Sequence, residues 1–330
     1  MGTVAERWAV AVMLLLGAPS AWAHHGGVTL GLGPGSPIET VCPLTLPQGG
    51  FVLSTRVEQV EWRRFGFAEP SNKTSITFTN VGLSYGITPY LMGSVFVPYT
   101  VKRQDGLDDV HDIGDLRFQL SCGFNYDPTK GFGLNRAADA AVILEGSKKV
   151  YLGGFASITT PTGKHNNLRP GETEVDKSMQ TGFGSPAFSF GLAAARHIVG
   201  SLSLTADTTY DIFTEADSFT YGSEFRFDLA PVYELYGKPE NFLSKVDGIL
   251  ELNLLNVARD KASGVSETAS GGTILYLSPG VRFSFPRVWN ANLGLLVKLP
   301  VWKDLNEQAR QQGSEGLEEY RAIVTLSFFF

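Results

Sequence analysis

The side chains in this sequence that could best bind a ligand or react are charged residues that alternate with apolar ones. Asp207 and Asp211, for example, stand at odd-numbered positions, whereas Ala206, Thr208 and Tyr210 stand at even-numbered ones. We call this odd or even position along a segment its parity. Other segments show the same arrangement and place further charges on one face: Arg56, Glu58, Arg117, Asp207, Asp211, Glu224, Arg226, Asp228, Glu251, Arg282, Lys298 and Arg321. Carboxylates and guanidinium groups on a shared face can pair with one another or bind the polar groups of a passing solute.

A spacing of two between like residues indicates β-strands, because successive side chains of a strand point to opposite faces. The alternating runs exceed the roughly 5–6 residues of common strands and suit the about 9–11 residues of a tilted bilayer crossing. The predicted strands are 51–64, 73–86, 90–103, 114–126, 148–160, 182–195, 201–213, 220–235, 246–259, 271–285, 290–303 and 319–330.

The charges determine which face looks where. An Arg or Lys directed at lipid near the bilayer centre costs about 2–4 kcal/mol, so the charged face must line an enclosed interior. Aromatic residues at the strand ends fit the two membrane interfaces: Tyr85, Tyr99, Tyr126, Tyr210, Tyr236, Trp302 and Tyr320. The pattern predicts an all-β fold: a transmembrane antiparallel up-and-down barrel of about 12 strands over 51–330, with short periplasmic turns and longer surface loops.

Both ends of the chain carry export signals. Arg7, the apolar run from Trp8 to Leu16, and Ala21-Trp22-Ala23 predict a secretory signal peptide over 1–23, cleaved after Ala23. The last strand resembles the insertion signal read by the barrel-assembly machinery, with these residues on one face: Tyr320, Val324, Leu326, Phe328 and Phe330. After residue 23 no apolar run reaches the length of a transmembrane helix. We therefore expect the protein to be located in the outer membrane of a Gram-negative bacterium.

Residues 24–50 are rich in Gly and Pro and show no strand pattern. They form either a periplasmic leader or a plug folded into the lumen. The single charge, Glu39, and the apolar patch from Val41 to Leu44 favour the plug. Cys42 could form a disulfide with Cys122, the only other cysteine. Strand parity argues against this pair, because it directs Cys122 toward lipid.

Charge and composition narrow the partners. Acidic residues far outnumber basic ones in the predicted surface loops, and the whole chain carries a net charge of −6. This acidic balance excludes nucleic acid as a partner, because binding nucleic acid needs a basic surface. It permits contact with lipopolysaccharide through divalent cations, alongside the surrounding membrane lipid. The sequence predicts no cofactor and no metal site.

Three functions remain open at this stage. The inward charges could line a path for a small solute, which makes the protein a channel or facilitator. They could instead only fill and stiffen the lumen of a structural or surface-interaction barrel. A third alternative, an outer-leaflet lipid hydrolase, needs a His–Ser pair, and the candidate histidines are His111 and His165 in loops. That arrangement is absent from the strand pattern, so we expect no enzyme.

Several local motifs resemble a known family. These are Tyr85-Gly-Ile-Thr-Pro-Tyr90, Phe96-Val-Pro-Tyr99, Ile113-Gly-Asp-Leu116 and Thr160-Pro-Thr-Gly163. Together they are similar to the outer-membrane proteins named for the meta-pathway of phenol degradation, over most of 50–330. The resemblance implies a barrel that admits small molecules, among them aromatic or hydrophobic ones. It implies no catalytic residues.

Overall fold

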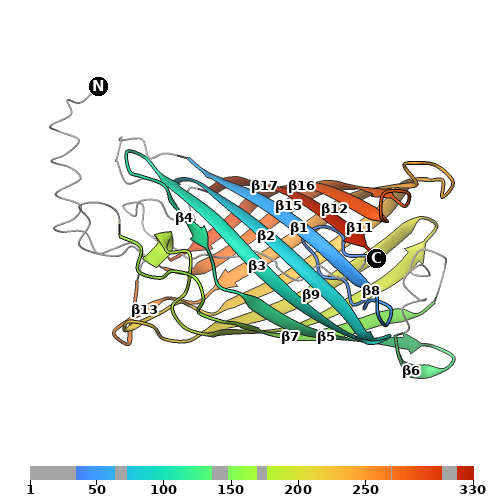
Figure 1. Ribbon diagram of the computed structural model, residues 1–330, viewed down its shortest axis with the longest axis horizontal. Coiled ribbons are helices and arrows are strands. Elements are labelled where there is room, and N and C mark those ends of the chain that lie inside the picture. The colour runs from blue at the N-terminus through green and yellow to red at the C-terminus, as the bar shows by residue number, and fades with distance from the viewer. Residues whose placement is uncertain (1–34, 64–72, 136–147, 169–176, 269, 307–317) are drawn as a thin grey trace.

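The long alternating segments form one closed sheet. The computed structural model describes residues 35–63, 73–135, 148–168, 177–268, 270–306 and 318–330, so the predicted signal peptide lies outside the described residues. Within them, 12 strands make the barrel (Figure 1). They are β1 (Phe51–Trp62), β2 (Lys73–Thr88), β3 (Leu91–Gln104), β5 (Arg117–Asp127), β7 (Val150–Thr159), β8 (Ala187–Val199), β9 (Leu202–Phe213), β11 (Glu224–Gly237), β12 (Lys245–Val257), β15 (Gly272–Phe285), β16 (Ala291–Leu305) and β17 (Glu318–Phe329).

The first and last strands close the ring. β1 pairs antiparallel with β17, from Val52 opposite Phe329 to Trp62 opposite Glu318. The N–H of Phe51 donates to the carbonyl of Phe330 at 3.1 Å, and the N–H of Phe330 donates to the carbonyl of Phe51 at 2.9 Å. Closure satisfies the backbone groups that an edge strand would expose, which a strand in lipid requires.

The outer face is apolar, as the parity argument predicts. On β8, Ser189 and Ala193 are buried inward, whereas Phe190 is 52% exposed and Leu192 is 66% exposed. Similar residues continue around the ring on β2, β5, β11, β12 and β16. So wide an apolar surface is stable against hydrocarbon and not against water. No helix in the described part of the chain is long and apolar enough to span a bilayer.

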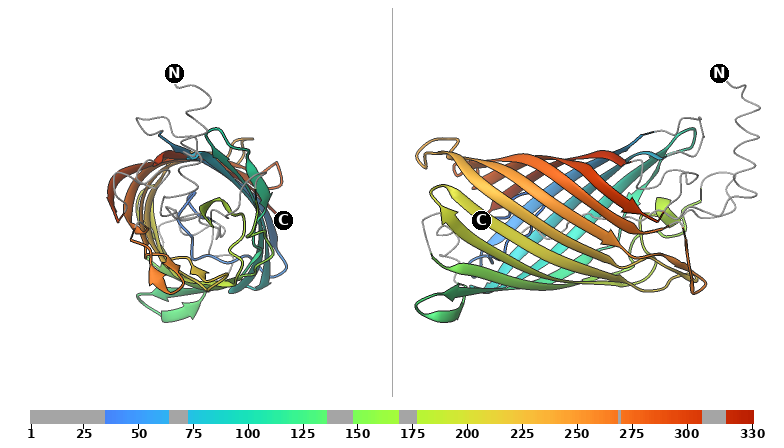
Figure 2. Two further views of the ribbon diagram at one scale, coloured as in Figure 1. Left: turned by 90° about the vertical axis from the view of Figure 1, so that its left-hand side faces the viewer. Right: turned by 180° about the vertical axis from the view of Figure 1, so that it is seen from behind.

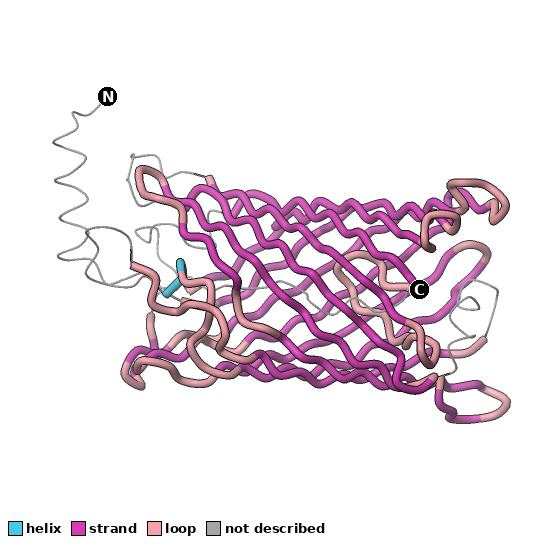
Figure 3. The backbone as a smooth tube through the Cα atoms, in the orientation of Figure 1, coloured by secondary structure: helices cyan, strands magenta, loops and turns pink. Residues whose placement is uncertain are grey.

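The two ends of the barrel differ. Short connections follow β2, β8 and β15 at the end that also holds Phe51 and Phe330, which we call the terminal end. Most of the longer connections lie at the opposite end, called the loop end (Figure 3). The small strands β10 (Phe219–Thr220), β13 (Lys261–Ala262) and β14 (Val265–Ser266) form a separate sheet there. The connection from Asp127 of β5 to Val150 of β7 is an exception, because it is long and lies at the terminal end. This alternation agrees with the predicted turns and loops.

Some boundaries differ from the prediction. The predicted loop 104–113 contains a strand, β4 (Val110–Ile113), which pairs with β3 beyond Pro98. The predicted strand 182–195 begins only at Ala187, because residues before it turn into the lumen. Beyond the terminal end, β5 continues into a hairpin with β6 (Gly131–Leu134).

Residues 35–50 lie inside the ring of strands, where Figure 2 shows them in blue. We call this segment the plug. Its side chains at Ile38, Val41, Leu44 and Leu46 are at most 5% exposed, so they are covered by the barrel wall. No strand is assigned within the segment. Its backbone groups bond with the wall instead, as where the N–H of Gly49 donates to the carbonyl of Gly86 at 2.8 Å.

Candidate functional site in the barrel lumen

The predicted charged residues all point into the lumen. Apart from Arg282, which is half-buried, they are buried: Arg56, Glu58, Arg117, Asp207, Asp211, Glu224, Arg226, Asp228, Glu251, Lys298 and Arg321. Buried charges at this density must be paired or bound by hydrogen bonds. Their partners fall into two groups, one around the plug and one nearer the loop end.

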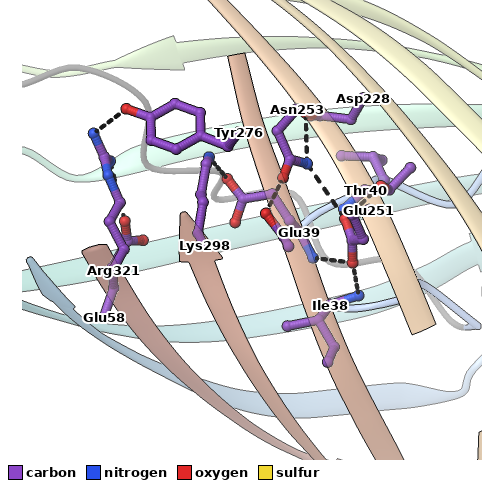
Figure 4. Close-up of polar contacts among 12 residues, drawn as sticks. Ile38, Glu39, Thr40, Glu58, Asp228, Glu251, Asn253, Tyr276, Lys298 and Arg321 are labelled. Carbon is purple, nitrogen blue, oxygen red and sulfur yellow. Dashed lines mark hydrogen bonds and ion pairs between the residues drawn. The ribbon is translucent and has the colours of Figure 1, made fainter. Parts of the chain in front are cut away.

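Glu251 on β12 holds the centre of the plug. One oxygen, Oε1, accepts the N–H groups of Ile38 at 2.9 Å and Glu39 at 3.0 Å. The other, Oε2, accepts the N–H of Thr40 at 2.8 Å and its hydroxyl at 2.6 Å (Figure 4). Beside it, Asp207 on β9 accepts the N–H of Val41 at 2.7 Å. Two wall carboxylates thus bind four successive backbone N–H groups, as an anion binds a row of backbone dipoles.

Glu39 of the plug forms ion pairs with the barrel wall. Its carboxylate pairs with Arg56 on β1 and with Lys298 on β16, the latter at 2.9 Å. Burial opposes ionisation of Glu39, but the positive charges of Arg56 and Lys298 outweigh it and lower the pKa of Glu39 below its usual value. Figure 4 shows the contact between the Glu39 carboxylate and the Lys298 ammonium as a dashed line. The one charge of the plug is therefore an ion-pair partner of the barrel.

A third cation contacts the plug nearer the terminal end. Arg282 on β15 donates to the carbonyls of Gly35, at 3.2 Å, and Ser36. The same guanidinium pairs with Asp247 on β12 at 2.7 Å, and Asp247 also pairs with Lys245 at 2.9 Å. Donors from the wall thus reach plug carbonyls, just as wall carboxylates reach plug N–H groups.

Apolar contacts complete the hold. Ile38 packs in a buried cluster with Val232, Ile249, Leu296 and Ile323 of the wall. A second cluster consists of Cys42 and Leu44 of the plug with Tyr151 and Ala195 of the wall. A third joins Leu46 to Val52 and Met92. Wall residues that would be polar in an open aqueous lumen are apolar where the plug lies.

Inward glycines make room for the plug. A Cβ added at Gly153 on β7 would stand 2.8 Å from the Cα of Pro43, and one at Gly86 on β2 would stand 2.0 Å from the carbonyl oxygen of Pro47. Both clashes are with backbone, which cannot move aside as a flexible side chain can. The wall is therefore shaped to fit the path of residues 43–47.

The cysteines do not form the disulfide considered from the sequence. Both are free thiols, with Cys42 buried. Cys122 shares the outward parity of Phe118, Leu120 and Phe124, so its side chain does not point to the plug. Burial raises the pKa of the Cys42 thiol to about 12.

At the loop end a second segment folds inward. Its short 3-10 helix, η2 (Lys177–Met179), lies near β3, where the Lys102 ammonium donates to the carbonyls of Ser178, at 2.9 Å, and Gln180. Asp115 accepts the N–H groups of Gly163 at 2.7 Å and Phe183 at 2.6 Å. Burial raises the pKa of Asp115 above its usual value. These contacts explain why β8 starts later than predicted.

A cavity lies between this inward segment and the plug. Along β9, Asp211 lines the cavity and Asp207 binds the plug four residues earlier, so the cavity is on the loop-end side of the plug. The cavity is open to solvent, and its empty space together with that open solvent is about 840 Å³. Arg226 pairs with Asp211, and Arg117 lies 3.8 Å from the same carboxylate. We call this space the vestibule.

Sequence reasoning missed several lumen residues. Lys102 shares inward parity with Thr100, and Asp247 shares it with Glu251, so extending the alternation would have found both. Asp115 lies two residues before β5, and Glu318 is the first residue of β17. Alternation gives no signal at such positions. Glu318 pairs with Arg321 at 2.8 Å, and Arg321 also pairs with Glu58 at 3.1 Å.

Comparison with known proteins bears on the fold. An outer membrane channel from Pseudomonas putida F1 superposes with a TM-score of 0.62 at 12% identity, over 91% of this chain and 100% of that one. The chain folds as an outer-membrane β-barrel. The NanC porin (TM-score 0.38, 9% identity, 84% of this chain and 98% of that one) and the β domain of the Bordetella autotransporter Brka (0.42, 10%, 86% and 100%) superpose less well.

No family model and no curated protein matches the chain. The resemblance to the meta-pathway of phenol degradation family therefore stays a prediction. At 12% identity the solved channel supports the barrel architecture and leaves the solute open.

Proposed function

We propose that this protein is an outer-membrane channel for small solutes, including apolar or aromatic ones, whose lumen is closed by the plug. The supporting observation is how the plug is held. Wall side chains, chiefly Glu251, Asp207 and Arg282, bind its backbone, and no strand is assigned within it. A segment held in this way can leave its place without breaking the hydrogen-bonded ladder of the barrel wall.

The proposal includes the route to the membrane. A signal peptide ending at Ala23 directs export, and the barrel-assembly machinery recognises the last strand. In the structure Tyr320, Val324, Leu326 and Phe330 are exposed on the outer face of β17, and Phe328 is half-buried there. That face is open to an assembly partner and to lipid.

The test compares the mature protein with two variants in planar bilayers. One lacks residues 24–50, and the other replaces residues 36–46 with a Gly–Ser stretch of equal length, so that the tether remains. Both should conduct far more than the intact protein, because each removes the ligands of Glu251 and Asp207. If both variants stay electrically silent and impermeable to small solutes while folded, the channel proposal is wrong.

A second candidate is a structural or surface-interaction barrel whose plug never leaves, with lipopolysaccharide as its partner. It is favoured by how completely the plug is bound, through N–H groups, carbonyls, Glu39 and three apolar clusters. It predicts that the deletion variant conducts while the intact protein never does, whatever solute is supplied. The hydrolase alternative gains no support from the contacts of its two candidate histidines, since His111 contacts the Tyr99 hydroxyl and His165 contacts Asp217.

A further inference from the structure

The vestibule combines two kinds of wall. Aromatic and other apolar side chains line one part, among them Phe78, Phe183 and Phe213. Phe183 and Phe213 contact each other with ring centroids 4.9 Å apart. Arg117 and Arg226 line the same space. A flat apolar group and an anionic group can therefore be accommodated within one cavity.

Arg226 has donor atoms without acceptors. Its Nη2 pairs with Asp211, but its Nε and Nη1 are buried and have no hydrogen-bond partner. The residue is 6% exposed, and it lines the vestibule. A buried guanidinium with unused N–H groups is costly unless another acceptor completes it. A carboxylate is the acceptor that suits guanidinium best.

The acidic residues of the vestibule have partners of their own. Asp211 accepts from the Ser189 hydroxyl and pairs with Arg226, and Asp115 is held by two backbone N–H groups. Glu224, the third acid, lines the same cavity as the cations Lys102, Arg117 and Arg226. The acids therefore balance the cations without filling the donor sites of Arg226. The amide oxygen of Asn80, also buried in this wall, has no partner and can accept from a hydroxyl.

From this geometry we propose that the vestibule binds a small aromatic carboxylate. The carboxylate accepts from the unused N–H groups of Arg226, and the ring packs against Phe183 and Phe213. This deepens the proposed function, on which its biological meaning rests, by naming a class of solute. Such a ligand would be held on the loop-end side of the plug, before passage.

The test measures equilibrium binding of three probes to the intact mature protein in detergent, by calorimetry. Benzoate has ring and charge, benzyl alcohol has the ring alone, and acetate has the charge alone. Benzoate should bind at least about 10-fold more tightly than either, since each part of the cavity contributes. Equal binding of benzoate and benzyl alcohol would overturn the proposal without any variant.

Variants then locate the site. Arg226→Met should weaken benzoate binding at least about 10-fold and leave benzyl alcohol unchanged. Arg259→Gln, an exposed cation at the same end, should bind like the intact protein. If Arg226→Met does not fold, Phe183→Ala takes its place and should weaken both ring-bearing probes. Unchanged benzoate binding in a folded variant would refute the assignment.

The two proposals fail separately. Benzoate binding with no conductance in either plug variant removes the channel and keeps the site. Conductance in those variants with no benzoate binding removes the site and keeps the channel.

Discussion

Glu251→Gln should release the plug, because each of the two carboxylate oxygens of Glu251 accepts two hydrogen bonds from the plug. The amide keeps one oxygen and turns the other into an NH₂ group. Whichever oxygen is lost, two of the four donors from Ile38, Glu39 and Thr40 lose their acceptor and face a donor instead. Each hydrogen bond to a charged group contributes about 1.5–3 kcal/mol, so the loss is about 3–6 kcal/mol. The displaced fraction should rise about 10²–10⁴-fold.

Cys42 reports this displacement. It is buried with the plug in place, and in a Cys122→Ser background it is the one thiol of the chain. A water-soluble maleimide should label Cys42 much faster in Glu251→Gln than in the parent, and single-channel conductance should rise in parallel. Glu240→Gln, in an exposed turn, serves as the matched control. A folded Glu251→Gln protein with parental labelling and conductance would refute the argument that this carboxylate holds the plug.

Three further predictions follow from other contacts. Gly153→Val should displace the plug and raise conductance, since its Cβ meets the backbone of Pro43, whereas Gly154→Val, the neighbour with only ordinary contacts, should not. With the plug in place, the pKa of Cys42 rises from 9.0 to about 12, which makes the thiolate about 10³-fold scarcer at pH 8. Maleimide labelling of Cys42 should therefore stay slow until the pH nears 12. Fast labelling at pH 8 would contradict the buried position. Phe330→Ala, which removes a ring stacked on Phe51 at 4.7 Å, should lower the amount of folded barrel in outer membranes, as judged by gel mobility without heating, whereas Phe132→Ala on the β5–β6 hairpin should not.

The barrel could be predicted from the sequence because one strong physical term repeats along it. At Leu202 to Ile212, hydrocarbon accepts only one parity of side chain, so each strand reports its own orientation. The direction of Arg56, Asp207 and Glu251 followed from the same rule. Aromatic residues such as Tyr85 and Trp302 then marked the strand ends.

The partners of those charges could not be predicted in the same way. Parity says that Glu251 points inward but not that it meets the backbone of residues 38–40, because backbone N–H groups leave no trace in the sequence. Likewise, the alternation before Ala187 favoured a longer β8. The contact between Asp115 and the Phe183 N–H, which turns the chain inward, joins residues far apart in sequence. Gly153 lies in an ordinary strand pattern, and nothing in the sequence indicates that Pro43 packs against it.

The plug is continuous with β1, joined to it through Gly49 and Gly50, and this tether changes what its affinity must be. A free peptide would need a dissociation constant well below its concentration in the periplasm to keep the pore shut. An attached segment meets its binding site at an effective concentration in the millimolar range. A modest intrinsic affinity is then enough for closure. Each excursion should also be brief, because the released segment is never far from the groups that recapture it.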